Sequence, residues 1–158
     1  MLDELANQIR LYGLALQRAH FNKNPGDHES IFQEAVDALL DELKSVVVEV
    51  NGRLPPGSSV TVDQGADEGW QLLFQQAGRS RPIVIAPLNR VNLPRLKVQL
   101  FTPAEELKPG PELEYAPVEW GRFEWRLSST WSGDHRAAAE WVVARVVDAA
   151  RRWSERAL

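Results

Sequence analysis

The segment Leu54-Pro55-Pro56-Gly57-Ser58-Ser59 divides the chain into two parts with different hydrophobic patterns. Before it, apolar residues recur every three or four positions, as in an amphipathic α-helix. After it, apolar and polar residues mostly alternate, as in β-strands with one buried face. The prolines and the glycine stop a helix, because proline lacks the amide hydrogen and glycine favours turns. The segment is too short for an interdomain linker, so we expect a single domain over residues 1–158.

Two amphipathic helices are expected before this segment. The first covers about residues 2–21, with its main apolar stripe at Leu2, Leu5, Ile9, Tyr12, Leu16 and Ala19. The second covers about residues 28–50, and its stripe continues through the β-branched run 46–50, where a strand is the alternative. The loop Asn24-Pro25-Gly26 joins the two helices, which predicts a helical hairpin over residues 2–50.

The alternating stretches predict about five strands, mainly antiparallel, within residues 59–129. Thr102-Pro103-Ala104-Glu105 has the pattern of a capping box with proline at the first helical position, which predicts one helical turn at about 103–107. Glu112–Ala116 is expected to begin a strand that Pro117 interrupts. A long amphipathic helix over residues 135–156 follows. The predicted fold class is therefore α+β, a two-layer sandwich of helices on a mainly antiparallel sheet.

Composition excludes several classes of chemistry. The chain has six Trp and no Cys, so it has no disulfide, thiol nucleophile or thiolate zinc site. We find no Walker A, GxGxxG, GxSxG or HExxH motif, and expect no catalytic residue, metal or cofactor. His28 and His135 could still meet buried carboxylates in the fold, which leaves a small hydrolase or ligand-binding domain as the weakest alternative. No apolar run is long enough to span a membrane and MLDELANQIR lacks signal-peptide features, so a cytoplasmic protein is expected.

Charge is distributed unevenly along the chain. The net charge of −4 argues against a general nucleic-acid binder. Residues 1–76 nevertheless hold 12 acidic and 5 basic residues, whereas residues 77–158 hold 10 acidic and 13 basic ones. Five bases and no acid lie between Arg79 and Lys97. Such local excesses are usually solvated surface, but this one supports binding of single-stranded nucleic acid as the alternative function.

The first helix has apolar residues on two sides. Leu11 and Leu14 point away from the main stripe, and Phe21 lies close to Leu14 in direction. A helix that is apolar on two sides is usually covered on both. We expect the domain itself to cover one side and a partner subunit the other, most simply in a homodimer. The alternative is that this helix lies in the middle of the helical layer.

All six tryptophans lie at or after position 70. Most share a strand or helix face with other apolar residues and are expected in the core, as Trp125 is. Trp120 instead falls on the polar face with Arg122 and Arg126, unless a bulge at Gly121 turns it inward. Exposed Trp and Arg are enriched in binding hot spots.

The leading hypothesis is a non-catalytic protein-binding domain, such as an adaptor, a chaperone-like protein or an inhibitor. Its predicted binding surface combines the second side of the first helix with an aromatic and basic sheet face, at Leu11, Leu14, Phe21, Trp120, Arg122, Arg126, Arg95 and Lys97.

Overall fold

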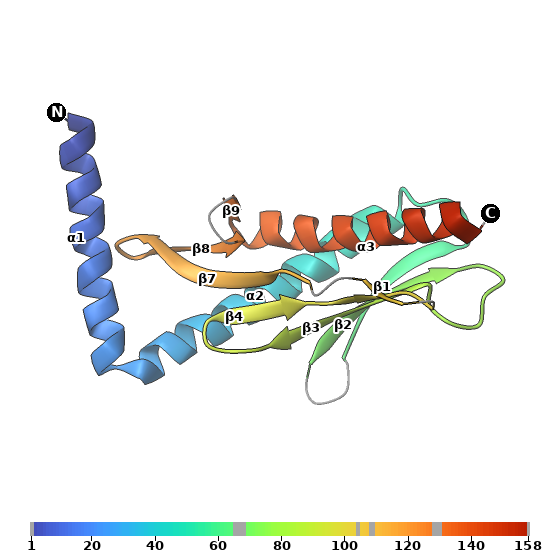
Figure 1. The fold of residues 1–158 in the computed structure, drawn as a ribbon, viewed down its shortest axis with the longest axis horizontal. Helices are drawn as coiled ribbons and strands as arrows, with labels where there is room; N and C mark the ends of the chain where they lie inside the picture. The colour runs from blue at the N-terminus through green and yellow to red at the C-terminus, as the bar shows by residue number, and fades with distance from the viewer. Residues whose placement is uncertain (1, 65–68, 104, 108–109, 128–130, 158) are drawn as a thin grey trace.

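The computed structural model describes the chain except for residues 1, 65–68, 104, 108–109, 128–130 and 158 (Figure 1). Its elements follow in the order α1 (Leu2–Lys23), α2 (Pro25–Asn51), β1 (Ser58–Gln64), β2 (Trp70–Gln76), β3 (Val84–Arg90), β4 (Arg95–Val98), β5 (Leu100–Phe101), β6 (Glu106–Leu107), β7 (Glu112–Glu119), β8 (Arg122–Leu127), β9 (Trp131–Gly133) and α3 (His135–Ala157). The predicted α+β fold class is confirmed, with nine strands within the described residues rather than about five.

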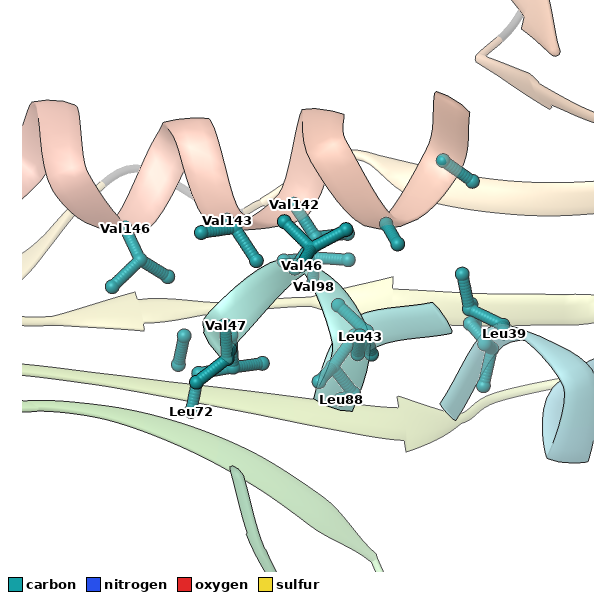
Figure 2. Close-up of a cluster of buried hydrophobic side chains, with 14 of the residues drawn as sticks. Leu39, Leu43, Val46, Val47, Leu72, Leu88, Val98, Val142, Val143 and Val146 are labelled. Atoms are coloured by element: carbon teal, nitrogen blue, oxygen red, sulfur yellow. The ribbon is translucent and has the colours of Figure 1, made fainter. Parts of the chain in front are cut away.

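The strands form one antiparallel sheet in the order β1-β2-β3-β4-β7-β8-β9, and the short β5 and β6 extend from β3. Helices α2 and α3 pack against each other and against the sheet. Figure 2 shows the core between them, where valines of α3 meet aliphatic side chains of α2 and of the central strands. The β-branched end of α2 is helical, because its stripe supplies Val46 and Val47 to this core.

The helical turn predicted at 103–107 is wrong, because Glu106 and Leu107 form β6 and pair with β5. The amide and the hydroxyl of Thr102 both donate to the carbonyl of Glu105, which turns the chain back towards β5. The capping pattern is therefore used in a hairpin, because pairing with an existing strand outweighs a short helical preference.

Pro117 does not interrupt its strand, since β7 continues to Glu119. The amide of Tyr115 points towards β4 and donates to the carbonyl of Pro94. The nitrogen of Pro117, two residues later, points to the same side, beyond the last pair that β7 forms with β4. The nitrogen of Pro117 therefore lies outside the β4–β7 ladder, and its missing amide hydrogen costs the sheet no hydrogen bond.

The N-terminal helices depart from the expected hairpin. They meet at Asn24, but α1 leads away from α2 and stands at one end of the molecule, where it reaches the tip of the β7–β8 hairpin (Figure 1). This arrangement gives α1 far less cover than a helix lying along α2 would have.

Candidate interaction surfaces

Helix α1 rests on the turn between β7 and β8 through a close approach at Gly13. A Cβ atom at Gly13 would lie 2.9 Å from the Cβ atom of Trp120. Gln17, one turn further along α1, is buried, and its side-chain oxygen accepts a 3.4 Å hydrogen bond from the amide of Gly121. Glycine thus lets the helix and the hairpin turn come together, and Gln17 satisfies a backbone donor at the contact.

The same side of α1 continues into an aromatic contact with the body of the protein. The ring of Phe21 stacks on His28, with 4.4 Å between ring centres, and lies 5.9 Å from the ring of Phe123. Leu14 is half-buried, whereas Leu11 is 44% exposed. Leu14 and Phe21, which we expected to face a partner, therefore face the protein's own body.

The main stripe of α1, expected to face the domain, instead faces solvent. Its five large members are 45–81% exposed, and we call them the α1 stripe: Leu2, Leu5, Ile9, Tyr12 and Leu16. The two sides of α1 are thus exchanged relative to the prediction. The reason is Gly13, because only the side that lacks a side chain there can reach the backbone at the hairpin turn.

Trp120 is exposed, at 62%, but not because of strand alternation. It lies in the β7–β8 turn beside Gly121, whose φ of 73° is a left-handed conformation that favours glycine. The pairing of β7 with β8 also shifts between Pro117 and Glu119. Because the Cβ atom of Trp120 lies close to Gly13, Trp120 belongs to the turn beside α1 rather than to a sheet face.

The basic side chains of the predicted surface lie among acidic ones. Arg95 is 3.7 Å from the carboxylate of Glu112 and 3.5 Å from that of Glu114. Arg122 is 3.4 Å from the carboxylate of Glu119. These ion pairs offset the positive charge that a phosphate backbone would need to meet.

Lys97 and Arg126 also face glutamates across the sheet. Lys97 is in register with Glu112, and Arg126 is in register with Glu114. Trp120 lies six residues beyond Glu114 in the chain, which is roughly 20 Å along an extended strand. The predicted surface is therefore two separate regions, one at the hairpin turn and α1, and one on the charged strands.

His135 belongs to an aromatic cluster that sequence reasoning missed. The ring nitrogen Nε1 of Trp125 donates a 3.0 Å hydrogen bond to Nδ1 of His135, and Tyr115 stacks on His135 at 5.6 Å between ring centres. The bond requires Nδ1 to be unprotonated. Burial lowers the pKa of His135 below its ordinary value of 6.5, while Asp134 and Glu42 oppose the shift. The sequence signal that could have found this cluster is strand alternation, which places Tyr115 and Trp125 on the inner face of the sheet.

The other two histidines make separate contacts. His28 stacks on Phe21, and burial lowers its pKa below 6.5. His20 contacts the carboxylate of Asp27 at 3.0 Å on the surface. Within the described part of the chain, no group of three or more His, Asp or Glu side chains could hold a metal ion. The composite site considered for His28 and His135 gains no support from these contacts.

Two open grooves lie elsewhere on the molecule. One, of about 440 Å³, runs between α2 and the strand ends, and has an aliphatic floor with Arg90 at its rim. That guanidinium already stacks over Phe32 and donates to Gln33. The other, of about 480 Å³, lies between α3 and the β5–β6 hairpin, where Arg156 pairs with Glu105 and Arg152 with Asp148. Neither arrangement resembles a nucleophile with its base.

No protein-family model, curated protein or solved structure matches this chain. Among the described helices, none is both long and apolar enough to cross a membrane.

Acidification is expected to destabilise the protein as the pH falls through 6.5. The folded-state pKa values of His135 and His28 lie below 6.5, so the unfolded chain binds protons first. The free energy of unfolding therefore decreases below pH 6.5, and it continues to decrease until the pH reaches the lower pKa values of the folded state. Denaturant unfolding at about pH 7.5 and about pH 5.5 measures this loss.

One substitution assigns the pH effect to a histidine. His135→Gln removes the titrating ring but keeps an acceptor for Trp125, so the pH dependence should shrink. Equal pH dependence in the wild type and in this variant would show that His135 does not carry the effect.

Proposed function

We propose that this protein is a non-catalytic protein-binding domain that uses the α1 stripe as its docking surface. The observation that carries the proposal is the exposure of five large apolar side chains on one side of a helix whose other side is docked. Adaptors, chaperone-like proteins and inhibitors all act through such surfaces. We place the protein in the cytoplasm as part of this proposal, since a chain without Cys gains nothing from an oxidising compartment.

The size of the exposed surface supports this function. Each side chain of the α1 stripe presents on the order of 100 Å² of apolar surface, so the stripe presents about 500 Å². Patches of this size are among the largest on ordinary monomers and are often functional. Trp120, in the turn beside Gly13, adds an exposed aromatic residue of the kind enriched in binding hot spots.

The shape of the molecule also supports docking through α1. Every described residue from 2 to 12 is exposed, so the first half of this helix gains no stability from the protein's own body. An isolated helix of about 12 residues is marginal in water, because nucleation is costly and propagation adds little. Burial of the α1 stripe against another protein would supply the missing stabilisation.

Site-specific crosslinking in living cells tests this function. A photoreactive phenylalanine analogue at Ile9, within the α1 stripe, should give a discrete protein adduct on illumination. The same analogue at Asn7, on the opposite side of the same helix, is the matched control and should give none. Absence of any adduct at positions 5, 9 and 12 would contradict a docking role for α1.

A further inference from the structure

We propose that the partner on the α1 stripe is α1 of a second copy of this chain, and that the two helices pair antiparallel. This inference rests on the proposed function, because it names the protein that the stripe binds. Three observations carry it: the distribution of charge along α1, the spacing of the α1 stripe, and the position of the docked half of the helix.

The charges of α1 differ between its two ends. Asp3 and Glu4 occupy the first turn, whereas Arg18 and Lys23 lie in the C-terminal part. Parallel pairing would place acids beside acids and bases beside bases. Antiparallel pairing brings the acidic end of each helix towards the basic end of the other and also opposes the helix dipoles. Asp3, Glu4 and Arg18 project away from the α1 stripe, so this attraction acts at long range and favours the direction of pairing without forming ion pairs across the contact.

The spacing of the α1 stripe gives a register for this pairing. Successive members are three, four, three and four residues apart, which is the a and d pattern of a coiled coil. When residue numbers in the two copies add up to 21, Leu5 lies opposite Leu16 and Ile9 lies opposite Tyr12. Leu2 then lies opposite Ala19, so every large side chain of the stripe has an apolar partner.

The position of the body favours the same direction. Only the half of α1 from Gly13 onward is held by the hairpin turn and the aromatic contacts. Antiparallel pairing lays the uncovered half of each helix along the held half of the other. In this register the partner's Gly13, with the exposed Trp120 beside it, comes level with residue 8 of the first copy. Parallel pairing would leave the two uncovered halves supporting only each other.

The area places such a dimer at the lower limit for a specific interface. Two stripes of about 500 Å² each bury at most about 1,000 Å² in total. A symmetric contact of one surface with itself is the commonest arrangement of soluble oligomers.

Sedimentation of the purified full-length chain tests the identity of the partner. The wild type should sediment at twice the mass of the 17.8 kDa chain. Ile9→Glu should raise the dimer dissociation constant at least about a hundredfold, because both copies lose a buried side chain at the centre. Asn7→Glu adds the same charge on the opposite side of α1 and should remain dimeric, and circular dichroism should show both variants folded.

Engineered cysteines test the direction, since the chain has none of its own. On oxidation, a mixture of Leu5→Cys and Leu16→Cys chains should form the mixed disulfide dimer. Leu16→Cys alone should form none, because its two copies would be 11 residues out of register, roughly 16 Å apart and beyond disulfide reach. Rapid crosslinking of Leu16→Cys alone would overturn the antiparallel arrangement.

The outcomes separate the two proposals. One outcome is a wild type that stays monomeric at high micromolar concentration while Ile9 crosslinks in cells to a different protein. That outcome would contradict a second copy as the partner and would still support the proposed function. A monomeric wild type with no crosslink at any stripe position would overturn both.

Discussion

Replacing Trp125 with alanine is expected to lower the free energy of unfolding by about 3–5 kcal/mol, the usual cost of removing a large aromatic ring from a core. The ring is fully buried and lies 4.9 Å from Tyr115 and 6.2 Å from Phe32, between ring centres. It joins the strands to α2 and donates to His135 at the start of α3. Urea unfolding of the variant and the wild type measures the change.

A second substitution separates packing from hydrogen bonding at this site. Trp125→Phe retains an aromatic ring but removes the donor to His135. Its free energy of unfolding should therefore lie between that of the wild type and that of Trp125→Ala. A loss below about 1 kcal/mol for Trp125→Ala would contradict a central packing role.

Gly110→Ala is expected to cost about 3 kcal/mol or more, as a severe case of overpacking. A Cβ atom at Gly110 would lie 1.4 Å from the carbonyl oxygen of Val98 and 2.6 Å from its carbon. Both are backbone atoms, so no side chain can rotate to make room. The segment must shift, and the 3.2 Å bond from the amide of Val98 to the carbonyl of Pro111 must shift with it. Thermal or urea unfolding measures the loss.

Gly26→Ala is the matched control for this effect. Gly26 lies in the first turn of α2, and nothing lies within 4 Å of a Cβ atom there. The variant should be more stable than the wild type by about 0.4–1 kcal/mol, because alanine restricts the unfolded chain. Similar stability of the two alanine variants would show that the backbone approach at Gly110 is unimportant.

Much of the fold could be predicted from local patterns. The change at Leu54–Ser59 separates the helical part from the strands, and in the structure it covers the end of the loop after α2 and the start of β1. Three-to-four spacing identified α2 and α3, while alternation identified the inner faces of the longer strands. These patterns succeed because a helix or strand in a two-layer fold buries one face, and the period of its sequence records that face.

Short elements were harder to predict. The pattern at 102–105 suggested a helical turn, but β6 pairs with β5 instead. Pro117 suggested a break, but its nitrogen faces a side with no neighbouring strand. In both cases the outcome depends on what lies beside the segment in space, and a single-residue preference carries no information about that.

The candidate site on α1 shows most clearly which features the sequence determines and which the tertiary structure decides. The sequence by itself determined that α1 is apolar on two sides, and it predicted that a partner subunit or the rest of the helical layer covers the second side. Only the tertiary structure decided which side, because the hairpin turn at Trp120 and Gly121 reaches α1 where Gly13 has no side chain. The longer stripe was therefore left exposed, although it carries more apolar residues. Helical periodicity records how apolar residues are arranged around an axis, but which side is covered depends on a contact more than 100 residues away in the chain.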